Sequence, residues 1–207
     1  MIASDVEQLR RNPLLVPITV DQYHQMIAAG ILEEGKPIEL LDGFLVRKDR
    51  SHAGDDPMTV GHEYLWAVYR LGELNEQLKP HKCFIMTQQP ITIPPDNEPE
   101  PDGAILKGAS DDYRKRLPEA ADILAVIEVA DSSLQDDRTA KQRIYATAGI
   151  SQYIIINLVG RTVEIYTAPD ARLGRYGSLQ SLKPGDSLRL PTGTEAELEV
   201  PVERLLP

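Results

Sequence analysis

Three charged side chains interrupt apolar segments of this sequence, and together they suit chemistry at a phosphodiester. Asp102 precedes the apolar run 103–106, Glu128 lies inside the apolar segment 123–130, and Lys141 follows in a segment of helical periodicity. A charge on a packed face costs free energy unless an opposite charge or a metal ion pairs with it. Two carboxylates on adjacent strands repel each other, so one should protonate unless a cation is present. Because Mg²⁺ prefers oxygen ligands and retains several waters, the pattern indicates a divalent-metal site.

The three side chains can meet if the elements that carry them are neighbours. Alternation along a strand 123–130 places Glu128 on one face with Leu124, Val126 and Ala130. In the helix expected next, Lys141 begins an apolar stripe at spacings i, i+3, i+4 and i+7, which continues through Ile144, Tyr145 and Ala148. A helix that packs back on its preceding strand would bring Lys141 toward Glu128. A strand starting at Asp102 is expected to lie antiparallel to 123–130.

Each of these residues also has a purely structural interpretation. Glu128 and Lys141 form a partly buried ion pair between helix and sheet in that alternative, and Asp102 is a turn or cap residue after Pro101. Glu39 is a candidate third carboxylate, or an exposed glutamate on a strand. His62, near the start of a long helix, is a candidate for contact with phosphate, or a structural histidine at a helix end. His24, His52 and His81 share no spacing, so no zinc site is expected.

The rest of the sequence predicts one α/β domain around a mixed sheet. Thr19 caps a helix at 20–29 that ends at Gly30, and Asp42-Gly43 turns a hairpin at 38–46. A second helix is expected at about 59–78 and a third at about 136–148. Strands are expected at 83–93, 102–106, 123–130, 153–158 and 162–167, followed by a terminal β-hairpin region with a turn at 184–186. Residues 48–57 and 107–122 are expected to be loops, the latter with some helix. Residues 1–17 form an irregular lead-in, and 18–207 the single domain.

Composition limits the function classes. The chain has 207 residues, of which 42% are hydrophobic and 26% charged, which is typical of a globular domain. The single Cys83 excludes an internal disulfide and a thiolate metal cage. No apolar run approaches the roughly 20 residues that span a bilayer, and no signal peptide is visible, so a cytoplasmic location is expected. The net charge of −10 weighs against strong non-specific binding to DNA, although basic residues cluster at 47–50, 79–82 and 114–116.

An ordered set of motifs resembles the Uma family of restriction-endonuclease-like proteins, within the PD-(D/E)XK nuclease superfamily. The motifs lie at 39–43, 100–102, 126–129, 137–146 and 149–150, and the resemblance spans roughly residues 18–167. It implies a restriction-endonuclease-like mixed β-sheet core flanked by helices. An extra N-terminal helix and hairpin and a C-terminal β-region would complete the fold.

The resemblance also implies roles for individual residues. Asp102 matches the first motif aspartate, and Glu128 matches the acidic residue of the second. Ala130 stands where the superfamily pattern has lysine, and the Uma-like pattern supplies that lysine from the next helix, here Lys141. Asp131 replaces a usually small polar residue. The implied metal ligands are the side chains of Asp102 and Glu128 and the backbone carbonyl of Val129.

The expected function is a metal-dependent endonuclease that hydrolyses DNA phosphodiester bonds. Mg²⁺ is the expected cofactor, with Mn²⁺ as a substitute, and Glu39 and His62 are accessory candidates. A homodimer is expected, since two sites related by a twofold axis suit cleavage of both strands. Two alternatives remain open: a nuclease fold without catalysis that serves in binding or assembly, and a small phosphodiesterase acting on nucleotides.

Overall fold

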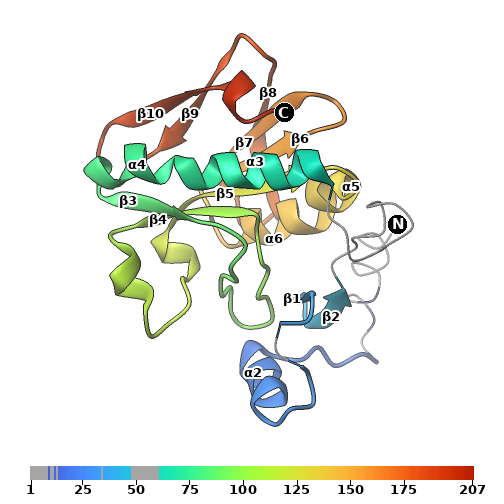
Figure 1. The fold of residues 1–207 in the computed structure, drawn as a ribbon. Coiled ribbons are helices and arrows are strands. Elements are labelled where there is room, and N and C mark those ends of the chain that lie inside the picture. The colour runs from blue at the N-terminus through green and yellow to red at the C-terminus, as the bar shows by residue number, and fades with distance from the viewer. Residues whose placement is uncertain (1–8, 10–11, 13, 34, 48–60) are drawn as a thin grey trace.

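A six-stranded sheet forms the centre of the protein, with strand order β3-β4-β5-β6-β7-β8 (Figure 1). The computed structural model describes residues 9, 12, 14–33, 35–47 and 61–207. Expected loop 48–57 and most of the expected lead-in 1–17 therefore lie outside the described residues. The strands of the sheet are β3 (Cys83–Met86), β4 (Gly103–Lys107), β5 (Ile123–Ala130), β6 (Gln152–Asn157), β7 (Thr162–Asp170) and β8 (Arg175–Leu182).

The sheet is mixed, as the sequence predicts. Strands β5 and β6 are parallel, whereas the other neighbouring strands are antiparallel. A parallel pair needs a crossover connection, and here that connection is helical: α5 (Leu134–Asp136), a π-helical turn (Asp137–Lys141) and α6 (Gln142–Thr147). The antiparallel neighbourhood expected for 102–106 and 123–130 is confirmed by the pairing of β4 with β5.

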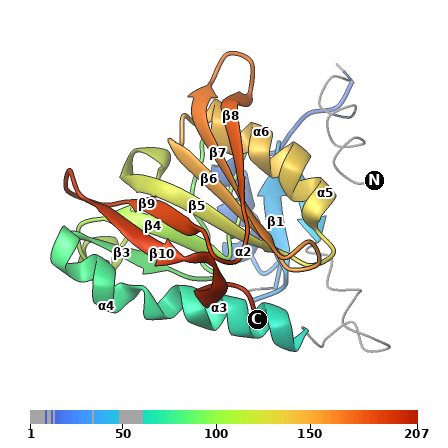
Figure 2. The same ribbon diagram turned by 90° about the horizontal axis from the view of Figure 1, so that it is seen from above.

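Helices cover both faces of this sheet (Figure 2). On one face, α3 (His62–Glu73), α4 (Asn75–Leu78) and the hairpin of β9 (Ser187–Pro191) and β10 (Glu197–Pro201) enclose one apolar cluster. On the other face, α6 encloses a second cluster that contains Tyr145 and Tyr153. Strand β6 contributes to both clusters, so it is a central strand that is covered on each side.

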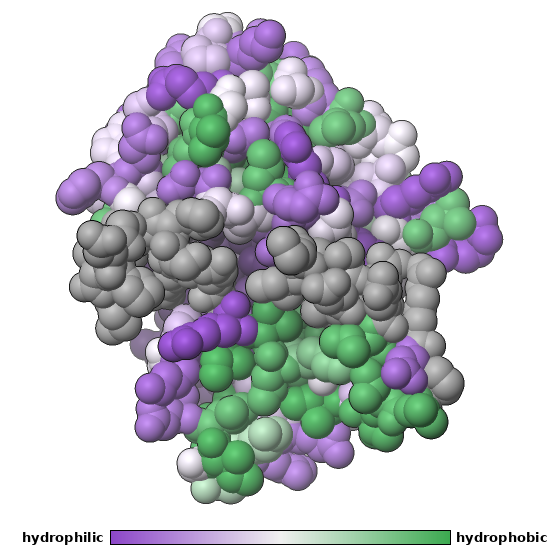
Figure 3. All heavy atoms as spheres, turned by 90° about the vertical axis from the view of Figure 1, so that its right-hand side faces the viewer, coloured by the Kyte–Doolittle hydropathy of each residue, from purple (hydrophilic) through white to green (hydrophobic). Residues whose placement is uncertain are grey.

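The N-terminal elements form a small appendage beside the sheet. They are α2 (Val20–Ala28) and the hairpin of β1 (Ile38–Leu41) and β2 (Phe44–Arg47). Thr19 and Gln22 form a capping box at the start of α2. Asp42 and Gly43 both have positive φ, 53° and 78°, as the predicted tight turn requires. Apolar side chains gather over this part of the surface (Figure 3), where the exposed residues include Leu14, Val16, Ile31 and Leu45.

Several predicted boundaries were wrong. The strand expected at 83–93 ends at Met86, since Gln88 has a φ of 52° and Pro90 cannot donate to a ladder. The helix expected at 59–78 divides at Leu74 into α3 and α4. The terminal region contains the expected turn at 184–186, but its strands do not form one hairpin. Strand β8 extends the main sheet, whereas β9 and β10 pair with each other.

A bulge in β5 overturns one part of the predicted alternation. The register between β4 and β5 shifts at Ile105/Leu106, and Leu124 packs on the α3 side rather than on the α6 side. Val126 and Ala130 remain on the α6 side. The extra residue of a bulge re-aims its neighbours locally, so the prediction for Glu128, beyond the bulge, is unaffected.

No helix among the described residues is long and apolar enough to cross a membrane.

Candidate functional site

Glu128 receives two hydrogen bonds on one carboxylate oxygen. It is 2% exposed in β5. Its Oε1 accepts from Lys141 Nζ at 3.0 Å and from the Tyr145 hydroxyl at 2.8 Å. Lys141 and Tyr145 are four residues apart in the helical crossover, so both face the strand on which the helix packs. The predicted approach of Lys141 to Glu128 is therefore confirmed.

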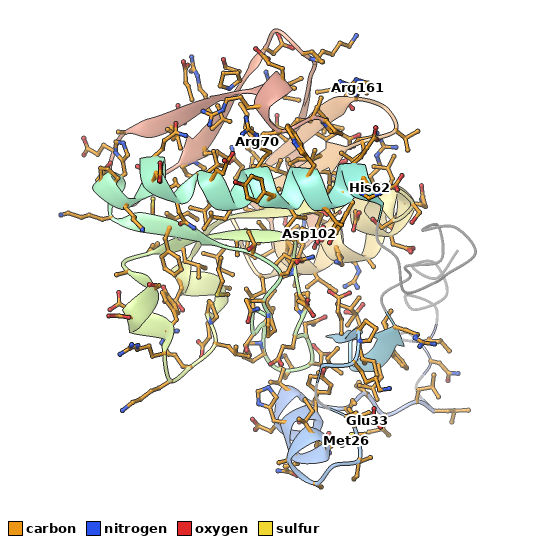
Figure 4. All side chains as sticks on the ribbon, in the orientation of Figure 1. Met26, Glu33, His62, Arg70, Asp102 and Arg161 are labelled. Carbon is orange, nitrogen blue, oxygen red and sulfur yellow. The ribbon has the colours of Figure 1, made fainter. Side chains whose placement is uncertain are left out.

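Asp102 lies beside Glu128 across the ladder of β4 and β5. Gly103 pairs with Ile127 in this antiparallel register, so Asp102, one residue earlier, stands opposite Glu128, one residue later. The Asp102 carboxylate is 5% exposed; its Oδ2 accepts from the backbone N–H of Val129 at 2.8 Å. Its Oδ1 accepts from the Tyr64 hydroxyl. Figure 4 shows Asp102 close to α3, the helix that carries Tyr64.

Lys141 also joins the site to the N-terminal hairpin. Its Nζ lies 3.4 Å from Glu39 Oε1 in β1. That oxygen also accepts from the backbone N–H of Glu100 at 2.7 Å. Glu39, at 3% exposure, is therefore a buried residue rather than an exposed strand glutamate. The Glu39 carboxylate therefore acts as an ion-pair partner of Lys141.

Asp137 is a fourth buried carboxylate near the site, and it is not among the residues that the sequence patterns single out. It is 1% exposed and accepts from the Ser133 hydroxyl at 2.6 Å, while its backbone carbonyl accepts from the Tyr153 hydroxyl at 3.1 Å. It lies in the π-helical turn, four residues before Lys141. The apolar stripe that identified Lys141 extends backward to this position, so the signal was present in the sequence.

These groups place more negative than positive charge in a buried region. In the part of the chain that the structure describes, Glu39, Asp102, Glu128 and Asp137 are buried with a single ammonium, that of Lys141. Burial raises the pKa of Glu128 to about 8; Asp137, Asp102 and Glu39 add to the rise, and Lys141 opposes it. Burial likewise raises the pKa of Asp137 to about 6. Burial alone would lower the pKa of Lys141, but the surrounding carboxylates, Glu128 foremost, raise it well above 10.5.

The donor set fits a hydrated Mg²⁺ ion better than a closed metal cage. In the described part of the chain, no group of three or more His, Cys, Asp and Glu side chains is arranged to hold a metal. Mg²⁺, however, is commonly bound by one or two carboxylates and keeps several waters. Asp102, immediately before β4, and Glu128, in the adjacent β5, supply two such carboxylates, and the surplus of buried negative charge favours a cation.

Neither His62 nor His24 joins this cluster. His62 is exposed at the start of α3 (Figure 4). Within the described ranges, no hydrogen bond or ion pair connects it to Asp102, Glu128 or Lys141. His24 pairs with Glu98 at 2.8 Å, and His52 lies outside the described residues.

The basic clusters are only partly described. Lys48 and Arg50 fall outside the described residues, whereas Arg114 pairs with Asp111, and Arg116 with Asp122.

Comparisons with known proteins agree with the fold. The family model Uma2, described as "Putative restriction endonuclease", matches residues 20–203. A crystal structure from Anabaena variabilis ATCC 29413, described as that of "a putative nuclease belonging to DUF820", has a similar fold. Its TM-score is 0.65 at 15% sequence identity, and the match covers 91% of this chain and 97% of that chain. No curated protein matches the sequence.

Proposed function

Because this chain belongs to the Uma2 family, we propose that it is a divalent-metal-dependent endonuclease that hydrolyses phosphodiester bonds in DNA. The observation that carries the proposal is the convergence of Asp102, Glu128 and Lys141 at one end of β4 and β5. Two carboxylates can hold a divalent ion that polarises a phosphoryl oxygen, and a neighbouring ammonium can stabilise the charge that develops there. The restriction-endonuclease-like fold supports the same reading.

Asp102 and Glu128 would hold Mg²⁺, or Mn²⁺ in its place, together with the backbone carbonyl of Val129. A bound ion of this kind polarises a phosphoryl oxygen and lowers the pKa of a coordinated water. Lys141 donates hydrogen bonds to the attacking water or to the phosphoryl oxygen on which negative charge develops. An ammonium suits that role because it is a compact charge with three donors. Glu39 holds the ammonium beside Glu128, since its Oε1 lies 3.4 Å from Lys141 Nζ.

The test is nicking of supercoiled plasmid DNA with Mg²⁺ or Mn²⁺. Asp102→Asn, Glu128→Gln and Lys141→Met should each slow nicking by about 100-fold or more, equivalent to about 2.7 kcal/mol or more at the transition state. The matched control is Glu199→Gln, which removes an exposed ion pair with Arg189 in the β9–β10 hairpin. This control should nick at the wild-type rate. Nicking that all three site variants retain at full rate would contradict the proposal.

The net charge of −10 favours a second candidate, a phosphodiesterase that acts on nucleotides or very short strands. A small substrate needs far less basic surface than duplex DNA. Incubation with a dinucleotide and with plasmid under the same metal conditions separates the two. Cleavage of the dinucleotide alone would assign the smaller substrate.

We further propose that residues 18–207 act as one domain and that the active form is a homodimer. Two copies related by a twofold axis present two sites to the two strands of a duplex. Sedimentation velocity measures the mass directly, and a monomer that nicks both strands at full rate would contradict the dimer.

A further inference from the structure

Each candidate ligand carboxylate is bonded to a tyrosine hydroxyl from a different helix. Tyr145 of α6 donates to Glu128 Oε1 at 2.8 Å, and Tyr64 of α3 donates to Asp102 Oδ1. The two helices lie on opposite faces of the sheet (Figure 2). The carboxylate of Asp102 is therefore held from the face that α3 covers, and that of Glu128 from the face that α6 covers.

The contacts of Tyr145 determine which oxygen of Glu128 is available to a ligand. Lys141 and Tyr145 both donate to Oε1, and among the described residues no hydrogen bond reaches Oε2. The terminal torsion of a glutamate is broad, so the carboxylate turns freely unless hydrogen bonds fix it. Two donors on one oxygen fix that torsion and leave the second oxygen for a metal ion.

The ring of Tyr145 is itself immobilised. The residue is 0% exposed, and its ring packs against that of Tyr153 with centroids 5.0 Å apart. An ordinary phenol is protonated at neutral pH, so the hydroxyl is a hydrogen-bond donor to Glu128.

Tyr64 has the corresponding role at Asp102, nearer the surface. Its hydroxyl accepts from Gln88 Nε2 at 3.1 Å while it donates to Asp102. The backbone N–H of Gln88 donates to the carbonyl of Asp102 at 3.3 Å. The segment after β3 thereby holds the phenol against the carboxylate.

We propose that Tyr145 and Tyr64 are positioning residues, which hold the carboxylates of Glu128 and Asp102 in the orientation that binds a divalent cation. The inference rests on the metal site of the proposed function. It adds two residues that neither transfer protons nor touch the ion. Groups that orient metal ligands in this way typically contribute about 10–100-fold to metal affinity.

The test is calorimetric titration of the full chain with Mn²⁺ alone. Tyr145→Phe keeps the ring and removes only the hydroxyl, and it should weaken Mn²⁺ binding by about 10–100-fold. The matched control is Tyr176→Phe. The Tyr176 phenol is also buried, and it donates to the backbone carbonyl of Ile150 at 2.8 Å, a neutral acceptor outside the site. Both variants lose one buried hydrogen bond, so a merely structural effect would appear equally in both.

Tyr64→Phe is the second variant. Because Tyr64 is only partly buried, removal of its hydroxyl should destabilise the core less. It should weaken Mn²⁺ binding in the same range, while Tyr176→Phe stays within about twofold of wild type. Wild-type affinity in folded Tyr145→Phe and Tyr64→Phe would overturn this inference and leave the metal site standing. Equal weakening in Tyr176→Phe would also overturn it. A wild-type protein that binds no Mn²⁺ would overturn both the inference and the proposed metal dependence.

Discussion

At the scale of single residues, the candidate site consists of one ammonium, that of Lys141, surrounded by carboxylates. Lys141 Nζ lies 3.0 Å from Glu128 and 3.4 Å from Glu39, and Asp137 and Asp102 act on it electrostatically. One positive charge does not balance four buried carboxylates, so Glu128 and Asp137 have raised pKa values. This imbalance predicts a pH dependence of stability that a simple ion pair would not give.

Without metal, the free energy of unfolding should fall as the pH rises from about 5 to about 8. A carboxyl whose pKa is higher in the folded than in the unfolded chain stabilises the fold while it is protonated. That contribution is complete below 4.5, the usual pKa of glutamate, and is lost as the pH passes about 8, the pKa of folded Glu128. Asp137 adds to the decline between 3.8 and about 6. Urea unfolding in EDTA at a series of pH values measures this decline in the free energy of unfolding.

Glu128→Gln should flatten this pH dependence, since an amide does not titrate in this range. The exposed Glu199→Gln variant should keep the wild-type dependence. Mg²⁺ should also reduce the decline, because a cation favours the ionised form of Glu128. An identical pH dependence in wild type and Glu128→Gln would show that Glu128 has an ordinary pKa in the folded protein.

At the scale of elements, the helical crossover and the N-terminal hairpin bring their side chains to the sheet. The π-helical turn buries both Asp137 and Lys141, and such turns are frequent at functional sites. The hairpin lies outside the main sheet and delivers Glu39. Its tight turn presses on the chain that precedes α2: a Cβ on Gly43 would lie 2.1 Å from Cβ and 2.8 Å from Cα of Pro17.

Gly43→Ala should therefore destabilise the protein more than Gly30→Ala. Both glycines have positive φ, 78° and 70°, so both substitutions incur the strain of about 1–2 kcal/mol for a left-handed residue. A Cβ at Gly30 would meet nothing within 4 Å, whereas overpacking at Gly43 should cost about 1–3 kcal/mol more. Urea unfolding of the two variants measures the difference. Equal losses of unfolding free energy would mean that Pro17 moves away from the new Cβ without destabilising the fold.

At the scale of the whole molecule, buried ion pairs join the N-terminal appendage to the sheet. Arg143 of α6 pairs with Asp42 in the turn of the hairpin, and the two side chains are 17% and 1% exposed. Together with the contact between Lys141 and Glu39, this pair connects the hairpin to the helical crossover. Loss of either contact should therefore affect elements that are distant in the sequence.

Arg143→Met should loosen the hairpin from the sheet at a cost of about 3 kcal/mol, the usual penalty for breaking a buried pair. In the wild type, the fluorescence of the single tryptophan, Trp66 in α3, and hydrogen exchange of the Leu40 amide should report one unfolding transition. In the variant, the Leu40 amide should exchange before Trp66 responds. The control Arg189→Met removes an exposed pair and should cost less than about 1 kcal/mol. Two separate transitions in the wild type would contradict the proposal that 18–207 is one domain.

The sequence by itself determined the periodic features of this protein. Alternation at Val126, Glu128 and Ala130 and the stripe from Lys141 to Tyr145 predicted which faces are buried, because local spacing fixes side-chain direction. The family resemblance added the restriction-endonuclease-like fold and the roles of the candidate residues, and the family match confirms the family. The candidate residues Asp102, Glu128 and Lys141 followed from those two sources.

Only the tertiary structure decided which groups share the site. The bulge at Leu124 depends on the pairing of β5 with β4, a strand distant in the sequence, which local spacing does not encode. The pairing of Glu39 with Lys141 and of Tyr64 with Asp102 spans 102 and 38 residues of sequence. Such contacts form because separate elements fill one buried volume and each buried polar group must find a partner there.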